Sequence, residues 1–424
     1  MIKRTGHADL PLHHGTVPHW LADRMRDLGT EIIQTILIEY GRKEVLMRLS
    51  DPLWFQSFGA VLGMDWHSSG ITTSVMYALK RGINARAREF GLCICGGRGK
   101  HSLKTPEELL FIADKTGLDG KALVRASKLA AKVDNTAVQD GFQLYQHNLI
   151  LSSDGSWAIV QQGMNPQAKS ARRYHWCSGN ISSFVEEPHA GVTGENRGTI
   201  LNLTDANARN TRNTILSISK ETPQKIIKEI SDIARLENPE ENRSAQLELF
   251  SDEFSDTAVH FDSGRTCTMP NRHHLCAEDV DLKRLGAVLV TAHESEPKDF
   301  ESLLLTPGLG PRTIQSLTLV SEVIYGTPSR FKDPARFSFA HGGKDGHPFP
   351  VPTRIYDESI RVLGDAIEKS KLGYTEKSEC IKRLHTTAIQ IEQNCQPEAD
   401  FEKTIAHEKS CSQEWRGRTV HCKA

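Results

Sequence analysis

Apolar residues near the start of the chain recur three or four positions apart: Leu21, Met25, Leu28, Ile32, Ile33, Ile36 and Leu37. Residues at this spacing share one face of an α-helix, which is then buried. The pattern predicts a helix that begins near Pro18 and helical structure over Glu31–Tyr40. Comparable patterns predict helices over Thr72–Lys80, Lys121–Val133 and most of 279–326.

Thr105 has the features of a helix start. A hydroxyl residue is followed by Pro106 in the first turn and by Glu107 and Glu108, whose charges suit the positive end of a helix. The sequence therefore predicts a helix that begins at this point.

Two runs of alternating apolar and polar residues predict a β-hairpin. The runs are Phe142–Leu151 and Trp157–Gly163, and Ser153-Asp154-Gly155 lies between them. Asp-Gly between alternating runs is a strong hairpin signal, and Asp154 is best explained as a turn former.

These elements predict an α+β protein. A length of 424 residues suggests two or three domains. We expect a mixed α/β domain with the hairpin in its sheet over 1–236, an acidic linker or insertion over 237–270, a mainly helical domain over 271–358 and a charged helical tail over 359–424.

Composition and charge exclude several protein classes. Hydrophobic residues make up 38% and charged residues 25%, as in ordinary globular proteins. The most apolar stretches are too short to span a bilayer, and no apolar stretch follows the first residues as in a secretory signal. Nine scattered cysteines then indicate reduced thiols, so we expect a cytoplasmic protein without a membrane partner. With 52 basic and 53 acidic residues, any nucleic-acid binding must depend on a local arrangement.

The most informative motif is Pro307-Gly308-Leu309-Gly310, which separates a short predicted helix from a longer one beginning at Pro311. Two helices joined by Gly–apolar–Gly resemble the helix-hairpin-helix module of DNA repair and processing proteins. In such a module the glycines allow a tight turn and bring amide N–H groups close to a phosphate. Leu309 fills the junction between the helices, and the second helix directs its positive end at the anion.

Contacts of this kind hold the phosphate backbone without reading bases. The DNA-binding residues that we predict in this module are Pro307, Gly308, Leu309, Gly310, Arg312 and Thr313. An ordinary tight turn between two core helices is the alternative.

A basic and aromatic run, Arg172-Arg173-Tyr174-His175-Trp176, suggests a second DNA contact. Guanidinium groups match phosphate oxygens, and exposed aromatic rings stack on unpaired bases. We therefore expect Arg172 and Arg173 to bind DNA, together with Lys344 in a glycine-rich segment. A buried strand is the alternative.

Carboxylates and imidazoles in the first half predict a site for a divalent metal ion (Mg, Mn or Zn). Oxygen and imidazole ligands suit these ions, and a bound cation can activate water against a phosphodiester. We expect Asp65, His67, Asp140, His147 and His175 to form or surround the metal. Asp65, Asp140, Gln161 and His175 are the candidate catalytic residues. An Asp followed by strands loosely resembles restriction-type nucleases, although Gln161-Gln162-Gly163 replaces their Glu-x-Lys.

Several blocks of the sequence resemble one prokaryotic family. They are Leu10–Gly15, Asp65–Gly70, Gln161–Asn165 and Asp333–Val351. Together they are similar to the domain of unknown function 763, over about 1–235 and 268–385. The family implies no activity, so function is argued from the residues.

We expect a metal-dependent DNA nuclease of repair or recombination that acts on branched, bubble or single-stranded DNA. One alternative is a DNA glycosylase of the helix-hairpin-helix type, with Asp333 about twenty residues after the motif as its carboxylate. Another is a non-catalytic DNA-binding scaffold for a repair complex. An enzyme that acts on duplex DNA is also expected to form a two-fold homodimer.

Overall fold

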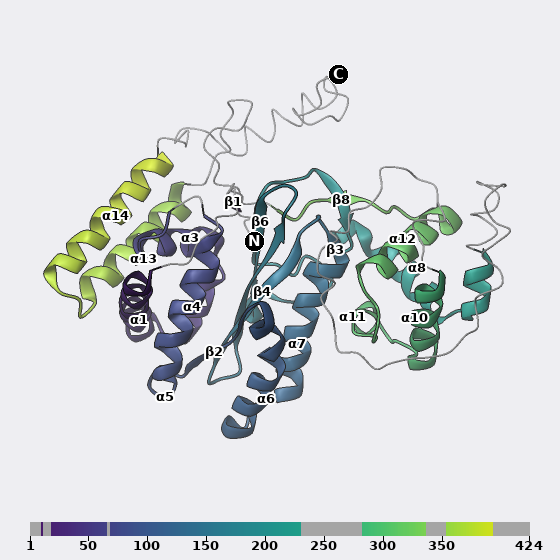
Figure 1. Ribbon diagram of the computed structural model, residues 1–424, viewed down its shortest axis with the longest axis horizontal. Helices are drawn as coiled ribbons and strands as arrows, with labels where there is room; N and C mark the ends of the chain where they lie inside the picture. The colour runs from purple at the N-terminus through teal and green to yellow at the C-terminus, as the bar shows by residue number, and fades with distance from the viewer. Residues whose placement is uncertain (1–9, 12–17, 66–67, 230–281, 336–352, 393–424) are drawn as a thin grey trace, which may run out of the picture.

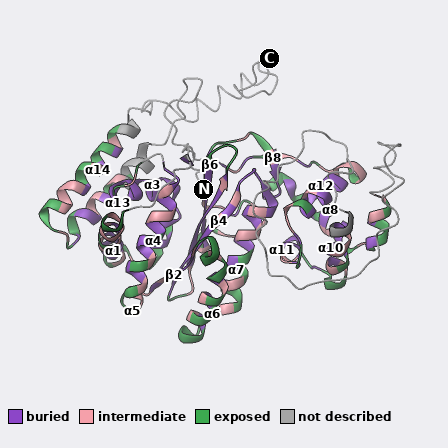
Figure 2. Cartoon of the chain, viewed as in Figure 1, coloured by how far each residue is buried: buried purple, intermediate pink, exposed green. Residues whose placement is uncertain are grey.

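The computed structural model describes residues 10–11, 18–65, 68–229, 282–335 and 353–392, and a β-sheet with helices on both sides lies at its centre (Figure 1). Helices and antiparallel strands confirm the predicted α+β class. Buried residues follow the strands and the inward faces of the helices (Figure 2). Each helical layer shares a separate hydrophobic core with the sheet.

The central sheet contains β1 (Leu10–Pro11), β2 (Leu92–Arg98), β4 (Gln143–Ser152), β5 (Trp157–Asn165), β6 (Ser170–Cys177) and β7 (Gly191–Thr193). Its order is β1-β6-β5-β4-β2, with β7 also paired to β6, and these pairs are antiparallel. The predicted hairpin is confirmed as β4 and β5. Its register sets Gln161 opposite His147 on one side and Tyr174 on the other, so these three side chains share a face.

One face of the sheet is covered by helices from both ends of the described chain. They are α1 (His19–Tyr40), α2 (Arg42–Leu49), α3 (Pro52–Val61), α4 (Gly70–Ala85), α13 (Thr353–Lys369) and α14 (Tyr374–Glu392), with the short α5 (Ala87–Phe90) before β2. The two predicted N-terminal helical segments form the single helix α1. The described part of the expected tail is helical, and α13 and α14 pack against α1 and α3.

The other face carries α6 (Thr105–Thr116), α7 (Gly120–Lys132) and the π-helical turn η2 (Val133–Ala137). Beside them lie α8 (Arg209–Lys220), α10 (Leu282–Ser295), α11 (Phe300–Leu304) and α12 (Pro311–Tyr325) (Figure 1). A small sheet of β3 (Val138–Gln139), β8 (Thr199–Asn202) and β9 (Phe331–Lys332) connects this group to the centre.

Local sequence accounts for the two helices that shape the candidate site. The Asp119 side chain accepts a hydrogen bond from the Ala122 amide (2.9 Å) and caps α7, and the apolar face of this helix is buried. Pro311 begins α12, where its missing N–H costs nothing. No helix in the described ranges is long and apolar enough to cross a membrane.

Residues Cys93–Arg98 lie in β2, because their backbone pairs with β4. The predicted helix start at Thr105 is confirmed, because α6 begins at this residue. The Thr105 hydroxyl does not cap the helix, since it donates to the Ser102 carbonyl oxygen.

Candidate nucleic-acid interface

The turn between α11 and α12, residues 305–310, is called the corner below. The side chain of Leu309 is 1% exposed and fills the space between the helices, whereas Pro307, Gly308 and Arg312 are exposed. Gly308 has a φ of +77°, a conformation that residues with a Cβ rarely adopt. The corner therefore combines a buried apolar anchor with an exposed glycine backbone.

Hydrogen bonds to carbonyl groups fix the corner and the first residue of α12. The ammonium group of Lys132 donates to the Leu309 oxygen, and Nε2 of Gln139 donates to the Pro311 oxygen at 2.7 Å. The amides of Gly308 and Gly310 donate to no residue in the described part of the chain. The corner is thus held from behind, and its glycine N–H groups remain available to an acceptor.

Helix α7 brings a row of basic side chains to the corner. Lys121, Arg125, Lys128 and Lys132 are spaced four, three and four residues apart, so they lie on one face, and α7 contains no acidic residue. Arg125 pairs with Glu301 at 3.0 Å. Among the described residues Lys128 has no ion-pair partner, and neither has Arg312 on the corner side of α12. This row is called the α7 basic face.

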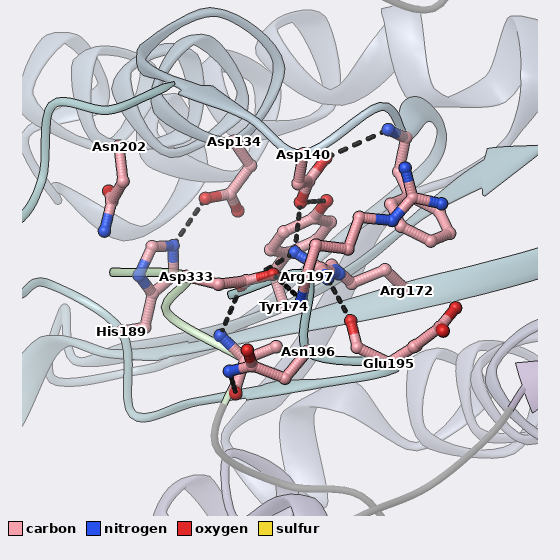
Figure 3. A network of polar contacts seen from close by, with 12 residues as sticks. Asp134, Asp140, Arg172, Tyr174, His189, Glu195, Asn196, Arg197, Asn202 and Asp333 are labelled. Atoms are coloured by element: carbon pink, nitrogen blue, oxygen red, sulfur yellow. Dashed lines mark hydrogen bonds and ion pairs between the residues drawn. The ribbon is translucent and has the colours of Figure 1, made fainter. Parts of the chain in front are cut away.

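Arg172 does not reach the surface. Its side chain is fully buried between two carboxylates, 2.9 Å from Asp140 and 3.0 and 2.9 Å from the two oxygens of Asp333 (Figure 3). The expected DNA contact by Arg172 is therefore wrong, because tertiary packing commits its guanidinium to an internal ion pair.

Asp140 and Asp333 are also structural. Asp140 accepts hydrogen bonds from the Tyr174 hydroxyl (2.6 Å) and the Phe142 amide (2.9 Å). Burial raises the pKa of Asp140, against the opposing charge of Arg172. Asp333 accepts from the Arg197 amide (2.8 Å) in addition to Arg172. Neither carboxylate is free to bind a metal or a substrate.

Arg173 points to the opposite face of the sheet and is also fully buried. It donates to His175 Nε2 and to the Gln56 side chain, each at 2.8 Å. Burial lowers the pKa of Arg173 to about 9, and burial also holds the pKa of His175 well below its usual value. The predicted DNA contact by Arg173 is wrong for the same reason as for Arg172, and the buried-strand alternative is confirmed.

The expected metal ligands are not brought together. His175 and the exposed Asp65 lie on the α1–α4 side of the sheet, whereas Asp140 and His147 lie on the α7 side. His67 and Lys344 fall outside the described residues. Within those residues no three His, Cys, Asp or Glu side chains form a group suited to a metal ion. Strand alternation separates His147 from His175, because Tyr174 and not His175 shares a face with His147.

His147 and Gln161 do meet. His147 Nδ1 donates to Gln161 Oε1 at 2.7 Å, and its Nε2 lies 2.9 Å from the Ser127 hydroxyl. Burial lowers the pKa of His147, so the ring is neutral in this network. Gln161 in turn donates to the fully buried carboxylate of Asp134.

Asp134 leads to a residue that the sequence did not single out as functional. The carboxylate accepts from Trp176 Nε1 (2.9 Å) and from His189 Nε2 (2.5 Å), and Figure 3 shows the second nitrogen of the imidazole turned away from Asp134. The His189 side chain keeps 7% of its surface exposed. No spacing pattern connects Asp134 with His189, because they lie 55 positions apart.

Comparison with known protein families gives one match. Residues 6–351 match the family described as proteins of unknown function, DUF763. The chain belongs to this family. The match covers all the elements from β1 to β9 and confirms the resemblance seen in the sequence. No curated protein matches the chain, and no solved structure does.

Proposed function

We propose that this chain is a DNA-binding protein that holds the sugar–phosphate backbone at the corner and along the α7 basic face. The observation that carries the proposal is the exposed glycine turn. The N–H groups of Gly308 and Gly310 donate to no acceptor among the described residues, whereas Leu309 is buried and the neighbouring carbonyl groups accept hydrogen bonds. Backbone N–H groups near a helix N-terminus form a favourable site for a phosphate.

The surrounding charges support the same partner. Arg312 is exposed in the first turn of α12, and Lys121 and Lys128 extend from α7 without described carboxylate partners. A local basic surface of this kind compensates for the nearly neutral net charge of the chain. Because the groups recognise phosphate and no base edge, binding is independent of sequence.

Cleavage of the bound DNA is the activity that we propose in addition, as a nuclease acting on branched, bubble or single-stranded substrates. The pair formed by Asp134 and His189 favours it, since this pair lies next to elements that support the corner. The glycosylase alternative is not favoured, because the carboxylate of Asp333 is buried and bonded to Arg172.

Fluorescence anisotropy with labelled single-stranded, duplex and forked DNA tests the binding. Gly308→Val blocks the corner with a side chain and strains a positive φ, and we expect it to weaken binding at least tenfold for all sequences. Gly326→Val is the matched control, because Gly326 has a φ of +67°, ends the same helix and has no atom near its added Cβ. Equal affinities of the two variants would contradict the proposal.

A further inference from the structure

The turn η2 carries Asp134 between two residues that contact the corner and the start of α12. Lys132 precedes this turn and donates to the Leu309 carbonyl oxygen of the corner, and Gln139 follows the turn and donates to the carbonyl oxygen of Pro311, the next residue after the corner. Helix α12 also packs against η2. The corner and the segment that orients Asp134 are therefore in direct contact.

The loop that carries His189 is tied to the same region. The amide of Phe184 donates to Glu301 of α11 at 3.2 Å, and Glu301 also pairs with Arg125 on the α7 basic face. The imidazole of His189 packs edge-on against Trp176, with ring centres 4.7 Å apart. The corner, the basic face and His189 thus belong to one connected group of elements.

The hydrogen bond to Asp134 defines how the imidazole can act. A carboxylate accepts, so Nε2 of His189 carries a proton and Nδ1 of the neutral ring carries a lone pair. Nδ1 has no hydrogen-bond partner within the described ranges. An imidazole oriented by a carboxylate, with its second nitrogen free, is the arrangement of a general base.

We propose that His189 is the general base that activates water for hydrolysis of DNA held at the corner. This inference rests on the proposed DNA binding and assigns the nuclease a catalytic group in place of the expected metal cluster. Nδ1 takes a proton from water while the water oxygen bonds to phosphorus. The bond from phosphorus to one sugar oxygen breaks, and that oxygen is protonated by solvent. The imidazolium then returns its proton to solvent, so the products are a phosphomonoester and an alcohol.

Asp134 is a positioning residue in this site. It accepts hydrogen bonds from Trp176 and Gln161 as well as from His189, so its orientation is fixed by three donors. Gln161 is in turn fixed by His147. Asp134 and the phenol ring of Tyr174 are the titratable groups beside the imidazole.

His189→Gln tests the assignment in the full-length chain with end-labelled forked and single-stranded DNA, in the presence of Mg²⁺ and of Mn²⁺. General base catalysis typically contributes 10²–10⁴-fold, so we expect kcat to fall at least about a hundredfold while the dissociation constant for DNA changes less than about twofold. His385→Gln is the matched control, because this exposed histidine lies on α14 across the sheet. The control should cut like the wild type.

Asp134→Asn distinguishes positioning from a purely structural contribution. Its carboxamide oxygen can still accept from Nε2, while its NH2 group replaces the oxygen that accepts from Trp176 and Gln161. The negative charge beside the imidazole is removed. We expect a lower kcat, unchanged KM and an acid limb of the pH–rate profile that moves to lower pH. A structural defect alone would reduce the amount of active protein and leave the profile in place.

Three results would overturn the assignment: undiminished cutting by the His189 variant, DNA binding without cutting by the wild type, or an abasic product. In each of these cases the proposed binding at the corner still stands. Failure of the wild type to bind DNA would remove the proposed function itself, so the two failures are distinguishable.

Discussion

Removal of one partner from the buried ion pair between Arg172 and Asp333 is expected to destabilise the fold strongly. Asp333 follows β9, and Arg172 lies on β6 of the central sheet, so the pair joins the small sheet to the large one. Both side chains are 0% exposed. Asp333→Asn removes the charge that faces Arg172 and places a carboxamide N–H group among four donors.

The size of the effect follows from this burial. Removal of one partner from a buried ion pair costs about 3–5 kcal/mol. Arg172 keeps Asp140 as a second partner at 2.9 Å, so we expect the lower end, about 3 kcal/mol. Arg172→Met leaves two buried carboxylates without a cation and should cost more than Asp333→Asn.

Urea unfolding followed by tryptophan fluorescence measures both variants. The midpoint should fall with little change in the slope m, because the surface exposed on unfolding is unchanged. Asp365→Asn is the control, since Asp365 forms a half-exposed pair with Arg361 on α13 and should change stability by less than about 0.5 kcal/mol. A loss below about 1 kcal/mol for Asp333→Asn would refute the ion-pair argument.

Three further outcomes are expected. Leu309→Ala should destabilise the chain by about 2–5 kcal/mol, measured by urea unfolding, because it empties a buried site. Lys128→Ala should reduce the slope of log affinity against log salt by about one for duplex DNA, measured by anisotropy, if this ammonium contacts one phosphate. Burial lowers the pKa of both His147 and His175 in the folded chain. In the unfolded chain each histidine takes up a proton below about pH 6.5, whereas the folded chain keeps it neutral. The free energy of unfolding is therefore highest above about pH 6.5 and falls as pH falls below that value. The loss is at most about 1.4 kcal/mol per pH unit for each histidine, and it ends once pH falls below the folded pKa. His175→Gln should remove the contribution of His175, and an unchanged pH dependence of the free energy of unfolding would contradict the assignment.

Local sequence determined the elements that carry the proposed interface. Asp-Gly between alternating runs predicted the hairpin of β4 and β5, and apolar spacing predicted α1 and α7. Leu309 was expected to fill the junction between two helices, and it is buried there. These features depend on turn chemistry and side-chain periodicity, which act over a few residues and are visible in the sequence.

Tertiary structure alone decided which polar side chains meet. Alternation along β6 shows that Arg172 and Arg173 face opposite ways, but it does not show that helices cover both faces and remove both from solvent. The partners of Arg172 lie 32 and 161 positions away, and Asp134 meets His189 across 55 positions. Contacts over such separations depend on how whole elements pack. The sequence therefore supplied the candidate groups, and the fold decided which of them are buried and which are exposed.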